Sequence, residues 1–103
     1  GSAQVQERLG LQVLPLNAQI RRQLRLNADT TGLVIGQVDP SSDAAAKGFR
    51  PGDVIIGANN RPVGTVADLE NAVRQARAAD RSAVLLRVQR GTAPPASVAV
   101  RLR

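Results

Sequence analysis

The sequence contains no cysteine and no histidine, and these two absences remove most of the chemistry that active sites use. Without a thiol or an imidazole, the chain cannot build a cysteine nucleophile, a disulfide, a histidine general base or a Ser-His-Asp triad. Metal sites made of cysteine and histidine are excluded for the same reason. We therefore expect no catalytic residue, no metal site and no cofactor in this chain.

Aromatic residues are almost as scarce, because Phe49 is the only one. Proteins that bind single-stranded nucleic acid commonly stack its bases on aromatic side chains. The net charge is +6, but thirteen of the fourteen cations are arginines that are spread over the whole chain. A dispersed surplus of this kind is typical of a solvated surface, so nucleic acid is not an expected partner.

Aliphatic residues, in contrast, are abundant, and hydrophobic amino acids make up 43% of the 103 residues. A chain of this length is expected to form one domain with its own core. No apolar run approaches the roughly 18 residues of a membrane span. Gly1-Ser2 resembles the scar of a cleaved tag, so residues 1–6 are predicted to be a tag remnant or linker, and residues 7–103 to be one domain.

Short strands and short helices alternate along the sequence. Apolar runs predict strands at residues 9–16, 32–38, 54–58, 83–89 and 97–102, with a short edge segment at residues 61–63. Capping residues predict helices after Asn17, after Ser41 or Ser42, and over residues 65–77. The pattern indicates an α+β fold, a partly open barrel or sandwich of five to six short strands capped by two to three helices.

The helix over residues 65–77 has the clearest signals. Thr65 and Asp68 stand at the spacing of a capping box. Val66, Leu69 and Val73 lie three and four residues apart and form an apolar stripe along one face. If this helix lies beside the first strand with a gap between them, the gap is a groove for an extended peptide.

The stretch Leu9-Gly10-Leu11 is the second candidate feature. It reads as a turn that leads into the first strand, in which several backbone N–H groups point the same way. Such a loop is a natural nest for a carboxylate, including the free C-terminus of a peptide. An ordinary strand entry is the simpler alternative.

In this order, the motifs resemble those of a PDZ domain. The most specific are Asp-Ala-Ala-Ala-Lys-Gly-Phe at residues 43–49 and Arg-Pro-Gly-Asp-Val-Ile-Ile-Gly-Ala-Asn at residues 50–59. Arg-Leu-Gly-Leu at residues 8–11 and Gly-Leu-Val-Ile at residues 32–35 precede them, and Val-Ala-Asp-Leu at residues 66–69 follows. The sequence of residues 52–59 and 86–91 looks like the second, C-terminal PDZ domain of bacterial HtrA/Do-type periplasmic serine proteases.

The resemblance implies a non-catalytic module that binds C-terminal or extended apolar peptide segments by β-strand addition. Carried over residue by residue, the carboxylate-binding loop falls on Arg8, Leu9, Gly10 and Leu11. Backbone pairing with the ligand falls on Leu11, Gln12 and Val13. Apolar groove positions fall on Leu9, Leu11, Val13, Val66, Leu69 and Val73. The chain departs from the family at Glu7-Arg8, where an aromatic residue is common.

The resemblance also implies a parent protein, an envelope quality-control serine protease and chaperone of the bacterial periplasm whose catalytic domain lies outside this chain. The implied partners are C-terminal or unfolded polypeptide segments, together with the protease domain and the other PDZ domain of the parent. We expect the isolated domain to be a monomer and the parent an oligomer. The alternative is a regulatory or structural domain with a vestigial groove, which mediates protease assembly or interdomain contacts.

Overall fold

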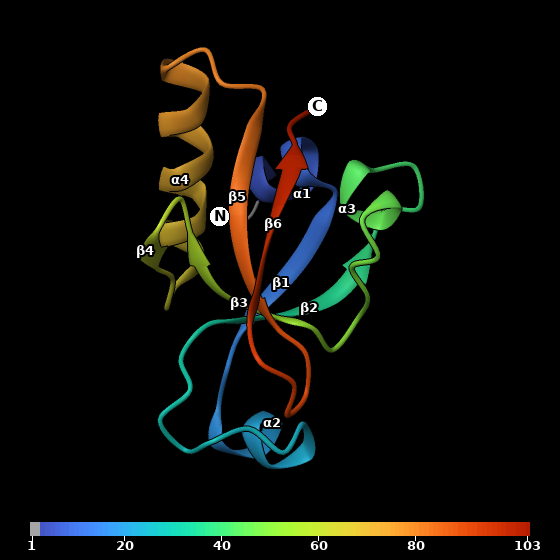
Figure 1. Ribbon diagram of the computed structural model, residues 1–103, viewed down its shortest axis with the longest axis vertical. Coiled ribbons are helices and arrows are strands. Elements are labelled where there is room, and N and C mark those ends of the chain that lie inside the picture. The colour runs from blue at the N-terminus through green and yellow to red at the C-terminus, as the bar shows by residue number, and fades with distance from the viewer. Residues whose placement is uncertain (1–2) are drawn as a thin grey trace.

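The computed structural model describes residues 3–103, which form a six-stranded antiparallel sheet and four helices (Figure 1). The strands are β1 (Leu11–Pro15), β2 (Leu33–Val38), β3 (Val54–Ala58), β4 (Arg61–Pro62), β5 (Ala83–Gln89) and β6 (Ala96–Arg101). The helices are α1 (Ala3–Leu9), α2 (Ala18–Gln23), α3 (Asp43–Ala46) and α4 (Val66–Ala78). The predicted fold class is confirmed, and α1 is the helix that the sequence did not predict.

The strands follow the order β1-β2-β3-β5-β6, and the short β4 pairs with β3. Thus β1 and β6 form the two edges of the main sheet. The register of β1 against β2 shifts between Gln12 and Val13, which oppose Gln37 and Ile35. Gly36 is therefore the extra residue of a β-bulge, and it bends the sheet beside the start of β1.

Side chains that cap the helices explain where these begin. Asn17 and Ser42 each accept a backbone N–H in the first turn of α2 and α3. In α4, the Thr65 hydroxyl accepts the Asp68 N–H at 3.1 Å, and the Asp68 carboxylate accepts the Thr65 N–H at 3.1 Å. The capping box is confirmed, and Ser42 rather than Ser41 caps α3.

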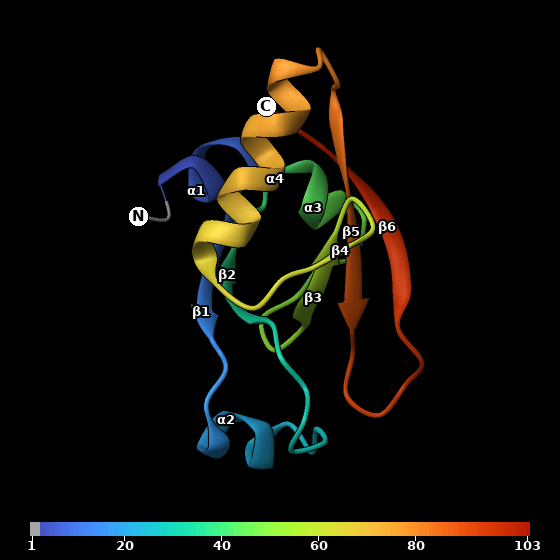
Figure 2. The ribbon, with the colours of Figure 1, turned by 90° about the vertical axis from the view of Figure 1, so that its left-hand side faces the viewer.

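The core lies between the sheet and the three helices α1, α3 and α4, which gather on one side of β5 and β6 (Figure 2). Aliphatic side chains such as Leu33, Ile55 and Leu86 fill it, and all three are completely buried. Helix α2 lies at the far end of the long axis from α1 and buries no residue of its own (Figure 1). The core therefore adjoins both β1 and α4.

Helix α1 corrects one sequence prediction. Residues 7–9, expected as a turn and the start of a strand, are the last turn of α1, and β1 begins only at Leu11. Residues 3–6 also belong to this helix, and Gly1-Ser2 lies outside the described residues, so the assignment of residues 1–6 to a tag remnant or linker stays a prediction. The physical reason is that Val5 and Leu9 lie four residues apart, share one helical face and are both buried in the core.

Candidate functional site

Strand β1 is an edge strand that pairs only with β2 in the part of the chain that the structure describes. Its other edge faces α4, which contacts β1. An edge strand presents a row of backbone N–H and C=O groups that a further strand can use. The geometry of the predicted peptide site therefore begins with the groups on this free edge.

Two hydrogen bonds fix which residues of β1 face the free edge. The Asp39 N–H donates to the Gly10 carbonyl at 2.8 Å, and the Leu16 N–H donates to the Gly32 carbonyl at 3.3 Å. Gly10 and Leu16 thus turn their backbone groups toward β2, and in an antiparallel pair every second residue does the same. Gln12, one of the predicted pairing residues, therefore also faces β2.

The remaining residues, Leu11, Val13 and Pro15, face the free edge. Leu11 and Val13 each offer a backbone N–H and a C=O group, as in the predicted pairing with a ligand. Pro15 has no N–H and offers only its carbonyl. The free edge can consequently donate to an added strand at two positions, Leu11 and Val13.

The structure brings the predicted groove side chains together, but inside the core. Leu9, Leu11, Leu69 and Val73 are at most 1% exposed, and Val13 is 7% exposed. Val66, at the start of α4, is half-buried and packs against the same cluster. Because these aliphatic side chains pack on one another, little of their surface lines an open groove.

The predicted carboxylate nest has one of its donors engaged. The Gly10 N–H donates to the Gln6 carbonyl at 3.0 Å and so completes the last turn of α1. Leu9 belongs to the same helix. The turn that the sequence predicted here is therefore replaced by a helix end, and the Gly10 N–H is available to a carboxylate only when this turn opens.

Both the backbone conformation and the close packing at position 10 require glycine. Its φ is +74°, in the left-handed region that glycine adopts most readily. A Cβ atom at this position would lie 2.5 Å from the Cβ of Ser42, in the loop before α3. The close approach joins the start of β1 to the loop that follows β2.

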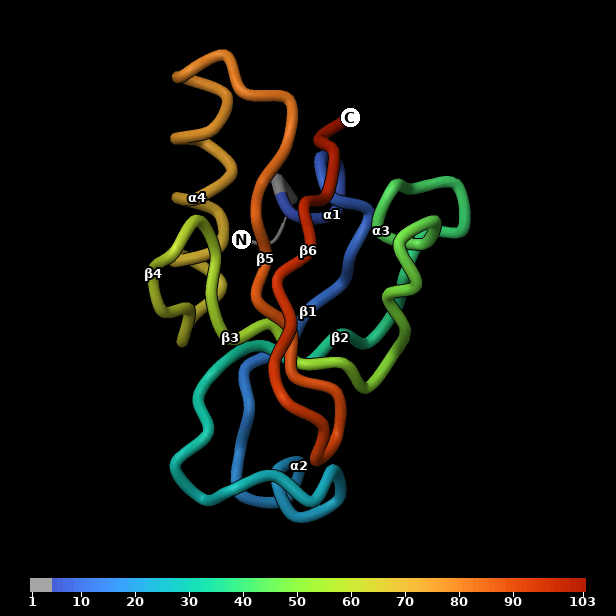
Figure 3. The backbone as a smooth tube through the Cα atoms, viewed as in Figure 1, coloured from blue at the N-terminus to red at the C-terminus, as the bar shows by residue number. Residues whose placement is uncertain are grey.

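Arg103, which no sequence motif singled out, holds the end of α1 against that loop. Its guanidinium lies 2.8 Å from the Asp39 carboxylate and donates to the carbonyls of Glu7 and Gln6 at 3.0 and 3.3 Å. Its backbone N–H donates to the Arg8 carbonyl at 3.0 Å. We call this set of contacts the Arg103 clamp. Helix α1 and the C-terminal end accordingly lie side by side (Figure 3).

The carboxyl group of Asp39 is stabilised in its charged form. The backbone N–H and the hydroxyl of Ser41 donate to it at 2.9 and 2.8 Å, and Arg103 adds an ion pair. These contacts lower the pKa of Asp39 to about 2. The Arg103 clamp is therefore charged on both sides at neutral pH.

Arg8, predicted to lie in the carboxylate-binding loop, is partly buried at the end of α1. Its Nη1 donates to the Arg103 carbonyl at 3.0 Å. Its Nε is buried and has no hydrogen-bond partner among residues 3–103. Arg8 thus lies beside the predicted nest, and one of its donors remains unused.

Two open clefts run along β1 below α1. One, of about 430 Å³, is lined by ten residues: Gln6, Glu7, Gly10, Leu11, Gln12, Gln37, Val38, Asp39, Pro40 and Arg103. The other, of about 340 Å³, is lined by Gln6, Gln12, Val13, Leu14, Gly36 and Gln37. Gln6, Gln12 and Gln37 line both. Leu14, which is 57% exposed, supplies an apolar surface at one end.

Over residues 3–103, the acidic side chains form no cluster of three or more that could hold a metal ion. None of the helices in this range is long and apolar enough to cross a membrane. The candidate site is therefore built from backbone groups, aliphatic side chains, glutamines and one ion pair. Such a set of groups can bind a polypeptide.

Comparisons with known proteins agree with this geometry. The family profile of the PDZ domain matches residues 7–100. The chain is 38% identical over 89 residues to the "Probable periplasmic serine endoprotease DegP-like" of Brucella suis biovar 1, covering 86% of this chain and 15% of that protein. The protein of the same name from Bartonella henselae is 49% identical over 61 residues, which are 59% of this chain and 12% of that protein.

Solved structures show the same fold. The PDZ domain of HtrA3 bound to a phage-derived ligand (FGRWV) superposes with a TM-score of 0.75 at 23% identity, covering 93% of this chain and 85% of that one. The HtrA-type protease AlgW with a decapeptide gives a TM-score of 0.69 at 24% identity, covering 92% and 29%. With a family match that spans most of its length, this chain belongs to the PDZ domain family.

Proposed function

We propose that this chain is a non-catalytic peptide-recognition module that binds C-terminal or extended apolar segments as an added strand on β1. The observation that carries the proposal is the free edge of β1, where Leu11 and Val13 face away from β2. Backbone pairing supplies affinity in this mode of recognition, and side-chain pockets supply selectivity. The peptide-bound relatives with the same fold support the proposal.

The closed form of the site favours extended segments over free C-termini. A C-terminal carboxylate needs the Gly10 N–H, which donates to Gln6 in this structure. An extended segment needs only the free edge and leaves α1 in place. Capture of a carboxylate by Gly10 and Leu11, with Arg8 as a nearby cation, requires the last turn of α1 to open first.

Selectivity is expected to be broad. The aliphatic residues that the groove shares with the core are already buried, so a ligand side chain meets Val66, Leu14 and the glutamines of the two clefts. Small and medium apolar residues fit this surface better than bulky aromatic ones. Because a short peptide loses conformational entropy over a small interface, we expect dissociation constants that are on the order of micromolar or weaker.

The test is a titration followed by backbone NMR with acetyl-Ala-Val-Leu-Val-Ala-amide, which has no free carboxylate. Saturable shifts at Leu11 and Val13 support strand addition. A matched peptide carries N-methyl groups on alternate residues, which remove the peptide N–H donors that would face β1. We expect its binding to be lost. A peptide that binds equally well after N-methylation, or that leaves β1 unperturbed, contradicts the proposal.

Modifying the peptide tests strand addition more cleanly than mutating Leu11 in the protein. Leu11→Glu would place a charge at a completely buried position, so the variant would report on folding rather than on binding. Changing the peptide backbone leaves the protein intact.

A regulatory or structural domain is the second candidate function. The observations that favour it are the buried groove side chains and the engaged Gly10 N–H, which together describe a closed site. In this function the domain contacts the protease domain or another PDZ domain of a periplasmic parent protease, and peptides have no effect. Analytical ultracentrifugation of this chain mixed with those domains of the Brucella relative tests it, with concentration-dependent association as the supporting result.

A further inference from the structure

The face of the sheet turned away from the core carries a further hollow. Along β5, Val84, Leu86 and Val88 point into the core and are buried, whereas Leu85 and Arg87 point to the opposite face. No helix among the described residues covers this face of β5 and β6, as Figure 2 shows. Its side chains are therefore open to solvent or to a partner.

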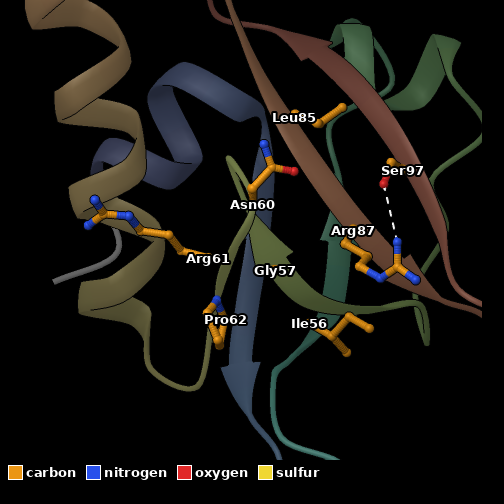
Figure 4. Close-up of a pocket in the computed structure, with 8 residues that line it drawn as sticks. All are labelled: Ile56, Gly57, Asn60, Arg61, Pro62, Leu85, Arg87 and Ser97. Carbon is orange, nitrogen blue, oxygen red and sulfur yellow. Dashed lines mark hydrogen bonds between the residues drawn. The ribbon is translucent and has the colours of Figure 1, made fainter.

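The hollow has a volume of about 350 Å³. It is lined by Ile56, Gly57, Asn60, Arg61, Pro62, Leu85, Arg87 and Ser97, which come from β3, β4, β5, β6 and the β3–β4 turn (Figure 4). We call it the outer-face hollow. The bottom of the hollow at Gly57 has no room for a side chain, because a Cβ atom there would lie 3.1 Å from the Arg61 carbonyl oxygen and 3.4 Å from the Arg87 Cβ.

The lining combines an apolar surface with one available cation. Ile56, Leu85 and Pro62 form the apolar part. Arg87 is exposed, and its guanidinium points toward Ser97, with 3.5 Å between Nη1 and Oγ (Figure 4). The Arg61 side chain lies on the rim and points away toward α4 (Figure 4).

The charged residues that line the hollow are both arginines. None of its lining residues is acidic. The ion pairs described within residues 3–103 join Asp43 to Lys47, Asp53 to Arg90 and Asp39 to Arg103, so none of them involves Arg87. A carboxylate is a favourable ligand for an arginine guanidinium, which binds it through charge-assisted hydrogen bonds.

We propose that the outer-face hollow binds an acidic-apolar peptide segment of a partner protein, in which an aliphatic residue is flanked by aspartate or glutamate. The aliphatic side chain rests on Leu85 and Ile56, and the carboxylate pairs with Arg87. The Ser97 hydroxyl and the Asn60 amide, which is directed toward Leu85 (Figure 4), hydrogen-bond to the segment. The volume lies at the low end of the range for ligand sites and suits one side chain with its neighbour.

This site is separate from the free edge of β1. It lies on β3, β4, β5 and β6 and uses none of the residues proposed for strand addition. The two proposals can therefore fail independently, because they predict perturbation of different backbone amides.

The test is an NMR titration of the 103-residue chain with acetyl-Ala-Asp-Leu-Asp-Ala-amide. We expect saturable shifts at Gly57, Leu85 and Ser97, and affinity that falls as salt rises. The matched peptide acetyl-Ala-Asn-Leu-Asn-Ala-amide removes the charge and keeps the shape, so its binding is expected to be about tenfold weaker or more. Shifts confined to β1 and α4, or equal binding of the two peptides, would overturn the proposal.

Two variants of the protein distinguish binding at this site from nonspecific electrostatic attraction to a basic protein. Arg87→Glu is expected to weaken binding of the aspartate peptide about tenfold or more. Arg77→Glu, at another exposed arginine, on α4, makes the same change in net charge and should leave binding within about twofold. Equal losses in both variants would contradict the site, as would tighter binding of a single-stranded oligonucleotide through Arg87.

Discussion

The Arg103 guanidinium lies 2.8 Å from the Asp39 carboxylate and joins the residues after β6 to the loop after β2. Through its hydrogen bonds to Glu7 and Gln6, the same guanidinium holds the end of α1. The Gln6 carbonyl is also the acceptor of the Gly10 N–H. The Arg103 clamp therefore stabilises the closed form of the predicted carboxylate nest.

Removing the clamp should open the nest. In Arg103→Gln, we expect faster amide hydrogen exchange at Gly10 and an affinity for a free-acid apolar peptide that rises about twofold to fivefold, the range of an exposed ion pair. The amidated peptide should bind as it does to the unchanged protein. Hydrogen exchange by NMR and calorimetric titration measure the two effects.

Arg22→Gln provides the control, since it removes an exposed arginine on α2, at the far end of the long axis from α1. If this control raises the free-acid affinity as much as Arg103→Gln does, the effect comes from net charge and not from the clamp.

Gly10 and Gly48 provide a matched pair for the cost of steric contact. Both have positive φ, +74° and +88°, but a Cβ atom at Gly48 meets nothing within 4 Å. Gly48→Ala should lower the free energy of unfolding by about 1–2 kcal/mol, the cost of a left-handed alanine. Gly10→Ala should cost about 1–3 kcal/mol more, because its Cβ would overlap Ser42. Urea denaturation measures both, and equal costs would show that the Ser42 contact relaxes freely.

The free edge of β1 predicts an alternation in amide exchange. The N–H groups of Leu11 and Val13 have no strand partner and should exchange faster than those of Gln12 and Leu14, which pair with β2. Bound peptide should slow Leu11 and Val13 and leave Gln12 and Leu14 nearly unchanged. Uniform protection along β1 in the free protein would show that its outer edge is already covered.

Acid should destabilise the fold in a defined pH range. The pKa of Asp39 is lowered to about 2, mainly by the Ser41 N–H and hydroxyl, so the folded protein binds this proton more weakly than the unfolded chain does. The contribution of Asp39 is thus complete above about pH 5 and is lost as the pH falls toward 2. The pKa values of Asp43 and Asp68 are lowered as well, chiefly by backbone N–H groups of Arg101 and Gly64.

Thermal unfolding between pH 7 and pH 2 measures this dependence. We expect a nearly constant melting temperature down to about pH 5 and a decline below it. Asp39→Asn should be less stable at neutral pH and should show a shallower decline. A variant with an unchanged slope would mean that Asp39 titrates alike in the folded and unfolded chains.

Local signals made much of the fold predictable. β3 and β5 coincide with the predicted strands, and Thr65 and Asp68 fix the start of α4 as expected. Asn59 and Asn60 have positive φ in the tight turn before β4, a conformation that asparagine adopts more readily than most residues. These features depend on neighbouring residues, so the sequence carries them directly.

The candidate site was harder to predict because its key contacts join distant parts of the chain. Arg103 and Gln6 are 97 residues apart, and no local pattern relates them. The Leu-Gly-Leu motif favours a turn that leads into a strand, and this prediction conflicts with the helix over residues 3–9, for which the spacing of Val5 and Leu9 is an available signal. Whether the predicted groove residues bind peptide remains a prediction.

The proline on the free edge of β1 also bears on self-association. An unprotected edge strand can pair with the same strand of another molecule and so begin an aggregate. Pro15 withholds one donor at the end of the edge, next to the exposed Leu14, and makes a long continuous ladder between two copies unfavourable. Pairing with a short strand at Leu11 and Val13, as proposed, is thus compatible with an edge that opposes the open-ended stacking that leads to fibrils.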